Sequence, residues 1–482
     1  MRSTSRQLRR RVLGALAVLP LLNPRFCGAQ QRRAPASSIP VWAPAAGRIV
    51  NISYPAGQHP LGRGATLAEI SPAYQDWNPT KPSVVLYGNR WYGWHTYNGY
   101  CGCTFNTDTR QIVLYGAGHA SINVCAPSCF DLNDRRWKWL DKPLPFDANA
   151  LAIRSGYPHP LSEARYREFY PPEQVDYLWG EVKGDWPGWP NGYGRPGKVQ
   201  PIPTHSRGTL IHIPGAVYGN GKGALLYHGK ATGLFSDTLS VASHLYDFDT
   251  NTWLRTANHY PTDGMSFHGC IFDRQSGKMV AFGNGSTQST TYRVFDVATR
   301  LWTTRRASVA VATSTDHPGN VLHEASRLHI VPAQRNALGQ SAHRGIKYHF
   351  WATPLDAIVG SGPFAPVLLT VSEQGGWPLN NEGNNAFIGW SYCPLDRCLY
   401  AINGIAGSDR YWRLAPPHRA VVQNDFLNGT WTLTEHSFID GKIASDGQVF
   451  NRLSWDEISL SFIWYGNAVT SVVQVFRPAT LL

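Results

Sequence analysis

A phrase of strand, turn and tryptophan recurs along this chain and constrains its fold more than any other feature. Each copy holds an apolar run, a turn with glycine, a second run, an aromatic–aspartate pair, and a tryptophan seven residues after the aromatic residue. Clear copies lie at 112–137, 225–253 and 279–302, and looser ones at 400–431 and 462–476. Trp253 and Trp302 are 49 residues apart, a period typical of four-stranded repeat units.

The repeat predicts an all-β fold in which each unit buries its apolar face by packing on the next unit, with the tryptophan between them. We expect a seven-bladed β-propeller of four-stranded antiparallel blades, with six blades as the alternative. A β-sandwich with coincidental turns is the competing fold. Residues 328–331 and 348–351 supply a degenerate blade. Strand candidates at 48–52 and 83–87 either complete the C-terminal blade, which closes the ring, or add a seventh.

The first residues have the pattern of an export signal rather than of a folded segment. Five arginines precede an apolar run, Val12 to Leu22, and the small residues Gly28 and Ala29 follow it. That run is too short to span a bilayer. We therefore expect a signal peptide at 1–29, a secreted or periplasmic protein without membrane insertion, and a single propeller domain at 30–482. Residues 141–203, rich in proline, glycine, tyrosine and tryptophan, interrupt the repeat. They predict a long loop over one face, or else a spacer.

The net charge suggests an acidic partner but not a nucleic acid. The full chain is formally +12; six of its arginines and none of its acids lie in 1–29, so 12 minus 6 leaves +6 for residues 30–482. A mildly basic surface attracts an acidic polymer. No run of lysines and arginines marks a nucleic-acid site, and an ordinary solvated surface is the alternative.

Seven cysteines follow residue 29, and in an exported protein disulfides are the default interpretation. Cys393 and Cys398 flank a four-residue turn, which predicts a disulfide across a hairpin. Two further disulfides are expected in a second group, with a structural zinc site as the alternative. This group consists of Cys101, Cys103, Cys125 and Cys129. Cys270 is then left as a buried free thiol.

Candidate site residues are polar side chains near the starts of innermost strands and after second strands, because a propeller brings these positions to one mouth of its channel. Histidines recur there in three consecutive units. The residues predicted to form the site are Asn98, Tyr100, His119, His205, Arg207, His228, Lys230, His268 and Asn284. Polar residues at corresponding places elsewhere are Tyr97, His317, Asn320, His323, Asn381, Asn384, Asn385 and Asn403. For any one histidine, a structural role is the alternative.

Several reaction classes lack their sequence signatures. No carboxylate pair for glycoside hydrolysis, no Gly-x-Ser-x-Gly elbow and no His-Glu-x-x-His motif accompany these positions. Histidine, tyrosine, arginine and lysine together suit β-elimination on a uronic acid. In that reaction the carboxylate is neutralised, a base removes the C5 proton, and an acid protonates the leaving oxygen.

Two phrases of the chain resemble those of bacterial kelch-like propellers. One is Tyr115-Gly-Ala-Gly-His119 followed by Phe130-Asp131 and Trp137; the other is Gly194-Arg195-Pro196 followed by Thr204-His205-Ser206-Arg207. Those propellers include the ulvan lyases and related enzymes that cleave uronate-containing polysaccharides. The resemblance covers about residues 95–305.

The resemblance implies a histidine pair in one blade and a tyrosine and an arginine in the next. His119 matches the second histidine, whereas Tyr100 or Asn98 stands near the first. His205 or Arg207 falls where the family has its tyrosine, and His228 or Lys230 where it has its arginine. His268 lies near a later tyrosine of the family's site.

We therefore expect a secreted polysaccharide lyase, with a non-catalytic glycan- or protein-binding propeller as the alternative and a metal-dependent hydrolase or oxidase as a third. Catalytic roles fall to His119, Tyr100, His205 and His228; His119 is base or carboxylate partner and Tyr100 acid or base. Arg207, Lys230, His268, Asn284 and Asn98 bind substrate, and His205 and His228 also clamp it. The expected partner is an acidic polysaccharide, and we expect a monomer. No cofactor is expected to be required; structural zinc or calcium is the alternative.

Overall fold

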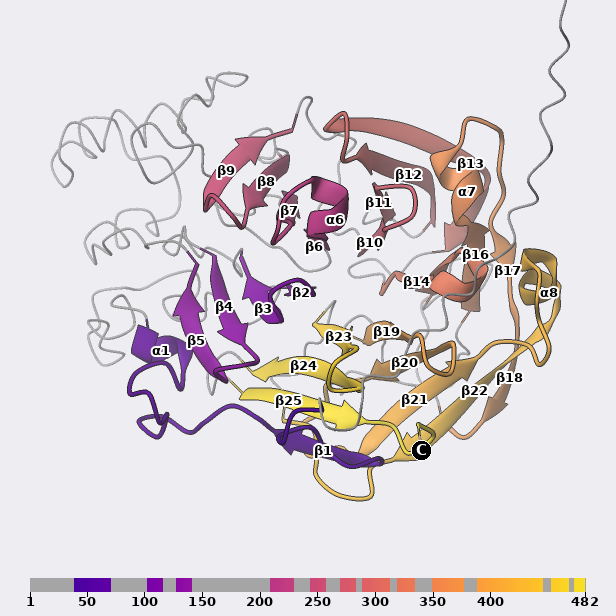
Figure 1. The fold of residues 1–482 in the computed structure, drawn as a ribbon. Coiled ribbons are helices and arrows are strands. Elements are labelled where there is room, and N and C mark those ends of the chain that lie inside the picture. The colour runs from indigo at the N-terminus through magenta and orange to yellow at the C-terminus, as the bar shows by residue number, and fades with distance from the viewer. Residues whose placement is uncertain are drawn as a thin grey trace, which may run out of the picture. The chain divides into compact units, whose positions relative to one another are not determined.

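The computed structural model describes residues 39–70, 102–115, 127–140, 209–228, 243–256, 269–282, 288–312, 319–333, 349–376, 388–444, 452–467 and 472–481. These residues form six β-sheets arranged as a β-propeller (Figure 1). Residues 1–38, with the predicted signal peptide, the strand candidate at 83–87 and the insertion at 141–203 lie outside the described residues. No helix in the described part of the chain is both long and apolar enough to cross a membrane.

The first three blades follow the chain in simple order, each a four-stranded antiparallel meander. Blade 1 consists of β2 (Cys103–Asn106), β3 (Gln111–Leu114), β4 (Ser128–Asp131) and β5 (Arg136–Trp139). Blade 2 consists of β6 (Leu210–Ile213), β7 (Ala224–His228), β8 (Ser243–Asp247) and β9 (Thr252–Arg255). Blade 3 consists of β10 (Gly269–Asp273), β11 (Lys278–Phe282), β12 (Gln288–Asp296) and β13 (Leu301–Ala312).

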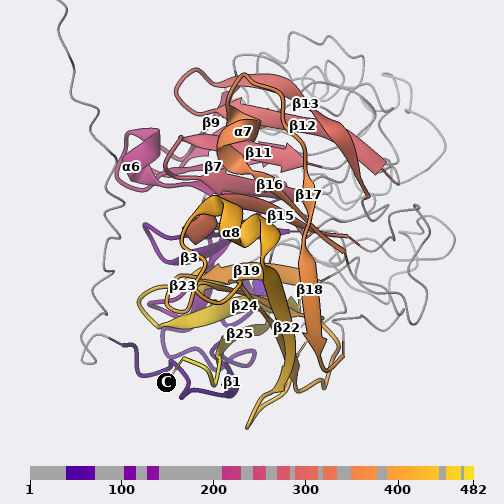
Figure 2. The same cartoon turned by 90° about the vertical axis from the view of Figure 1, so that its right-hand side faces the viewer.

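Blades 4 and 5 are linked by a strap on the outside of the molecule. Blade 4 consists of β14 (Val321–His323), β15 (Leu328–Ala333), β16 (His349–Pro354) and β17 (Val367–Leu368). Blade 5 consists of β19 (Gly389–Cys393), β20 (Cys398–Ile402), β21 (Arg410–Ala415) and β22 (Thr430–Ser437). After β17 the chain continues into β18 (Thr370–Gln374), which pairs in parallel with β22 (Figure 2). The strap thus adds a fifth strand to blade 5.

Blade 6 joins the two ends of the described chain. Its strands are β23 (Leu453–Asp456), β24 (Ser461–Asn467), β25 (Val472–Arg477) and, as the outermost strand, β1 (Arg48–Asn51). Ile49 pairs with Phe476 in this antiparallel ladder. The prediction of seven blades was therefore wrong and the six-bladed alternative is confirmed, because the strand at 48–51 completes the last blade instead of founding a new one.

Short helices lie between some of these strands. They are α1 (Leu67–Ile70), α6 (Gly215–Tyr218), the 3-10 helix η3 (Glu324–Ser326), α7 (Leu355–Val359) and α8 (Gln423–Asn428). In blade 5, α8 replaces the expected aromatic–aspartate turn. Asp425 lies within this helix and accepts hydrogen bonds from the N–H groups of Val421 (2.9 Å) and Val422 (3.0 Å). The looser fourth copy of the repeat therefore keeps its tryptophan but not its turn.

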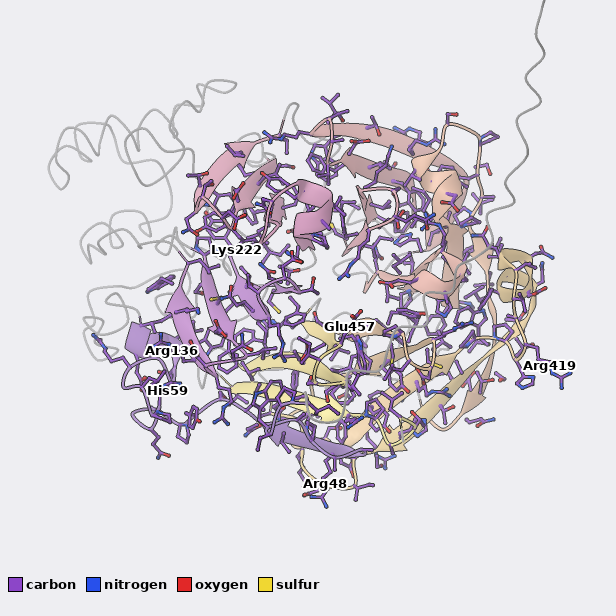
Figure 3. The ribbon with its side chains drawn as sticks, in the orientation of Figure 1. Arg48, His59, Arg136, Lys222, Arg419 and Glu457 are labelled. Carbon is purple, nitrogen blue, oxygen red and sulfur yellow. The ribbon has the colours of Figure 1, made fainter. Side chains whose placement is uncertain are left out.

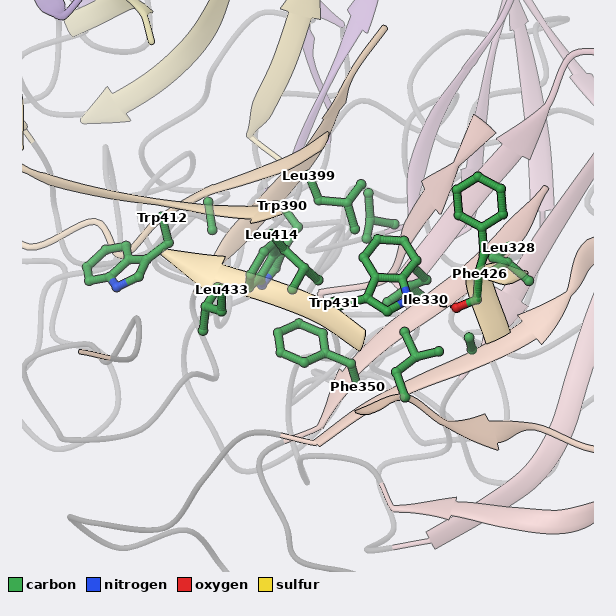
Figure 4. Close-up of a cluster of buried hydrophobic side chains, with 14 of the residues drawn as sticks. Leu328, Ile330, Phe350, Trp390, Leu399, Trp412, Leu414, Phe426, Trp431 and Leu433 are labelled. Atoms are coloured by element: carbon green, nitrogen blue, oxygen red, sulfur yellow. Dashed lines mark hydrogen bonds between the residues drawn. The ribbon is translucent and has the colours of Figure 1, made fainter. Parts of the chain in front are cut away.

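Each pair of neighbouring blades shares one apolar cluster, so six clusters close the ring. The predicted position of the tryptophans is confirmed: Trp137, Trp253, Trp302 and Trp431 are buried against the blade before their own. The ring of Trp253 lies 4.7 Å from that of Tyr115 in blade 1, centroid to centroid. Figure 4 shows the cluster around Trp431, to which blades 4 and 5 both contribute.

Two recurring turns explain why the repeat carries aspartate or asparagine where its strands end. Asn106 Oδ1 accepts the N–H groups of Asp108 (3.0 Å) and Thr109 (3.1 Å). Asp247 Oδ1 does the same for residues 249 and 250 in blade 2. The next strand then begins after a residue in the left-handed region, Arg110 (φ 56°) or Asn251 (φ 53°). The carboxylate or amide thus pairs turn N–H groups that the strands leave without partners.

Candidate functional site

The propeller has two ends that the chain uses differently. At one end the first strand of a blade begins and the second ends; register pairs there include Cys103 with Leu114 and Gly269 with Phe282. We call this end the connection face. The other end, where short turns join first to second strands, is the turn face. The innermost strands β2, β6, β10, β14, β19 and β23 contact one another in that order, so they surround the axis.

In sequence, the predicted site residues lie within five positions of strand ends of the connection face in three adjacent blades. The described residues nearest to them in sequence are Gly102, Tyr115, Thr209, His228, Gly269 and Phe282. Each of these begins, ends or directly adjoins a first or second strand at that face. The strand topology therefore places these six described residues at the same end of the propeller, the connection face.

The side chains of the predicted residues themselves are outside what the structure describes. His228 is the last residue of β7, where its backbone pairs with Ser243. The other eight predicted residues lie outside the described residues, namely Asn98, Tyr100, His119, His205, Arg207, Lys230, His268 and Asn284. Tyr97, His317, Asn381, Asn384 and Asn385 also lie outside them.

His323 was expected at the channel mouth beside these residues, and that expectation was wrong. β14 has three residues, so His323 ends the innermost strand on the turn face instead of beginning it. Its Nε2 lies 2.7 Å from the carbonyl oxygen of Arg397 in blade 5, and its Nδ1 lies 2.6 Å from Ser326 Oγ. Burial lowers its pKa to about 4. His323 is a neutral structural histidine that joins two blades.

Asn320 and Asn403 have structural contacts at the connection face. Asn320 Nδ2 donates to the carbonyl oxygens of Gly269 (2.7 Å) and Phe282 (3.3 Å) in blade 3. This contact also shows that β10 and β14 begin at the same end of the ring. Asn403 Oδ1 accepts the N–H of Ile405 (3.2 Å) and so shapes its own turn.

Arg452 is a residue at the connection face that sequence reasoning missed. It directly precedes Leu453, the first residue of β23, and its side chain is buried. Its Cζ lies 5.3 Å from the centre of the Tyr465 ring, near the end of the second strand. Blade 6 adjoins blade 1 through their shared cluster, so this guanidinium belongs to the blade beside the one whose strands lie nearest in sequence to Tyr100 and His119. Its position directly before an innermost strand is the sequence feature that could have identified it as a candidate.

The turn face carries a second group of charged residues. Asp108 Oδ2 lies 3.3 Å from His212 Nε2 and accepts the N–H of Gly215 at 2.7 Å. The Thr107 N–H donates to His212 Nδ1 (3.4 Å). The hydrogen bond from His212, aided by Gly215, lowers the pKa of Asp108, while burial lowers that of His212. His212 therefore connects blade 2 to Thr107 and Asp108 of blade 1.

Glu324 begins the 3-10 helix η3 of blade 4, and Glu457 lies in the first turn of blade 6, which Figure 3 shows near the centre of the ring. Burial, Glu457 and Asp273 raise the pKa of Glu324, and Arg274 opposes them. Arg274 in turn donates to Thr107 Oγ1 (3.4 Å), which ties blade 3 to blade 1. Within the described residues no three histidine, cysteine, aspartate or glutamate side chains are grouped to hold a metal.

The described cysteines exclude a bond between Cys103 and Cys129 and a single zinc site for their group, and they confirm the expectation for Cys270. Cys103 packs in the cluster between blades 6 and 1, whereas Cys129 packs in the cluster between blades 1 and 2. They therefore point to opposite faces of blade 1, two strands apart, and neither one disulfide nor one zinc ion could hold both. Cys101 and Cys125 lie outside the described residues. Cys270 is a buried free thiol, as expected.

No family model matches this chain, and no curated protein matches it. The fold alone therefore defines its class: an all-β, six-bladed β-propeller whose N-terminal strand completes the last blade.

Proposed function

We propose that this protein binds an acidic, uronate-containing polysaccharide at the connection face and cleaves it by β-elimination. One observation carries the proposal: the strand ends nearest in sequence to Tyr100, His119, His205 and His228 belong to one face of two adjacent blades. Strand ends that are far apart in sequence thus belong to the same face of the propeller. The phrases that resemble the kelch-like ulvan lyases fall in the same part of the sequence, at 115–137 and 194–207.

The chemistry requires three functions, and the residue types at these positions can supply them. A cation or hydrogen-bond donor neutralises the uronate carboxylate, which acidifies the C5 proton; Arg207, Lys230 and the histidines can do so. A histidine, the residue type whose ordinary pKa is near neutrality, then removes that proton, and we assign this step to His119. Tyr100 protonates the leaving oxygen. The formal charge of +6 for residues 30–482, 12 minus 6, favours an acidic polymer.

A screen of acidic polysaccharides tests the proposal directly. β-Elimination leaves an unsaturated uronate, so ultraviolet absorbance should rise with the number of new reducing ends. His119→Ala should abolish the rise while the circular dichroism spectrum stays that of the wild type. His418→Ala, a change at an exposed histidine of blade 5, is the matched control and should retain full activity. Full activity in His119→Ala would remove this residue from the mechanism.

A non-catalytic glycan-binding propeller is the second candidate. Asn320 and Asn403, two described polar residues of the connection face, are engaged in structural hydrogen bonds, as a rigid binding surface would need. This candidate predicts retention of an acidic polysaccharide without product. Affinity electrophoresis in gels containing each polymer, compared with the absorbance assay, separates the two functions.

A further inference from the structure

The last residue of a blade's first strand faces the first residue of its second strand, and blade 5 fills this pair of positions unlike the others. In blade 5 the pair is Cys393 and Cys398, directly opposite in register. The corresponding pairs of the other blades are Asn106–Gln111, Ile213–Ala224, Asp273–Lys278, His323–Leu328 and Asp456–Ser461. Two cysteines therefore occupy both members of a pair that three blades fill with polar side chains.

Cys393 occupies the position at which those three blades have asparagine or aspartate, and it accepts hydrogen bonds in the same way. The N–H groups of Leu395 and Asp396, two and three residues on, donate to its sulfur. Asn106 and Asp273 accept from the same two positions in their own turns. A polar acceptor would serve this turn as well, so the turn alone does not explain why a second cysteine lies directly opposite.

Both thiols point to the same side of the sheet and are buried. They belong to the cluster between blades 5 and 6, together with Tyr400 and Phe462. Residues directly opposite in an antiparallel pair have Cα atoms about 4.5–5.5 Å apart, within the separation of about 4.4–6.8 Å that a disulfide spans. In the structure both are free thiols.

We propose that Cys393 and Cys398 are a disulfide site that closes the inner hairpin of blade 5. In the balanced reaction, the Cys393 thiolate attacks a small-molecule or protein disulfide and releases one thiol. Cys398 then loses its proton and displaces the second thiol from the mixed disulfide. Two protein S–H bonds are replaced by one S–S bond, and the oxidant's disulfide is reduced to two thiols. The site goes beyond the proposed function and does not rest on it.

The two thiols should react slowly in the folded protein, so we expect the disulfide to form during folding. Burial raises the pKa of the Cys393 thiol to about 12 and also raises that of Cys398. The attacking thiolate is then scarce once blade 6 covers the hairpin. The bond should form in an oxidising compartment before the ring closes, and a chain that folds reduced should oxidise slowly afterwards.

Peptide mapping tests the site, because Arg397 lies between the two cysteines. The full chain is recovered from an oxidising compartment, alkylated in denaturant without reductant, and digested with trypsin. Trypsin cuts after Arg397, so the two cysteine peptides stay joined only if the disulfide exists. We expect a linked pair in most of the protein, with Cys270 fully alkylated as an internal standard. Complete alkylation of both cysteines, or linkage of either to another cysteine, would overturn the proposal.

The stabilising role is tested with a variant that keeps the turn acceptor. Cys393→Asp with Cys398→Ser copies the Asp456–Ser461 pair of blade 6. Reductant should lower the thermal midpoint of the oxidised wild type more than it lowers the midpoint of this double variant. Equal shifts in both proteins would show that another disulfide responds and would refute a role for this pair.

Discussion

Arg110 in the first turn of blade 1 donates to Asp456 of blade 6 over 2.7 Å, joining residues 346 positions apart. Both side chains are largely shielded from water, with exposures of 13% and 3%. Asp456 also accepts N–H groups of its own turn, from Ile458 and Ser459. The contact therefore couples the turn that ends β23 to the blade at the other end of the chain, on the turn face of the ring.

Replacing Arg110 with methionine should destabilise the propeller by about 1–3 kcal/mol, because the change leaves the buried carboxylate of Asp456 without its cation. Chemical denaturation followed by tryptophan fluorescence measures the loss. The matched control is Lys222→Met, which removes the cation of an exposed pair with Asp249 and should cost under about 0.5 kcal/mol. If both substitutions lowered the free energy of unfolding equally, the Arg110–Asp456 pair would stabilise the ring no more than an exposed ion pair does.

The N-terminal strand should contribute to the stability of the whole ring. Ile49 in β1 is buried in the cluster between blades 5 and 6. Truncating Ile49 to alanine should lower the free energy of unfolding by about 2–4 kcal/mol, because it leaves a cavity in this cluster, where β1 covers the edge of β25. Val41→Ala, at a fully exposed position, is the control and should change the unfolding midpoint little. An Ile49→Ala variant as stable as Val41→Ala would show that β1 is dispensable.

Trp431 should be a principal contact between blades 4 and 5. Its indole N–H donates to the carbonyl oxygen of Phe426 (2.8 Å), and its ring lies 5.0 Å from that of His323. Trp431→Phe should lose about 1 kcal/mol with the hydrogen bond, whereas Trp431→Ala should lose about 3–5 kcal/mol. Calorimetry measures both; equal losses would mean that the indole packs less tightly than the structure indicates.

The sequence was sufficient for the blade but not for the number of blades. Period, turns and tryptophans all reflect local rules, so the meander and the position of Trp253 between blades could be predicted. Whether residues 48–51 begin a blade or complete one depends on pairing with β25, more than four hundred positions away. Nothing local distinguishes the two outcomes.

The candidate site was predictable as a set of positions, not as a geometry. The rule that first strands begin where second strands end predicted His228 just after the second strand of its blade, and in the structure His228 is the last residue of β7. It failed for His323, since a three-residue strand moves that histidine to the other face. It also missed Arg452, which directly precedes the first strand of the last blade.

Acid should weaken blade 4 through His329, whose ring contacts Phe282 and Tyr292 of blade 3 at 5.9 and 5.7 Å, centroid to centroid. Among the described residues, neither ring nitrogen has a hydrogen-bond partner, and the uncharged Tyr292 and Thr353 lie around it. Burial lowers its pKa from 6.5 to about 3. The unfolded chain therefore takes up this proton first, so the stability is present above pH 6.5 and is lost as the pH falls toward 3.

His323, with its pKa lowered to about 4, acts in the same direction on the blade 5 side. Each histidine should add up to about 1.4 kcal/mol per pH unit to the acid slope of the unfolding free energy. Between pH 6.5 and about 5 most carboxylates stay ionised in both states, so urea midpoints in this window isolate the histidines. His329→Leu should flatten the slope, whereas His418→Ala, at an exposed position, should leave it unchanged. A slope in His329→Leu as steep as that of the wild type would mean that this histidine stays neutral in the unfolded chain too, or finds a partner when folded.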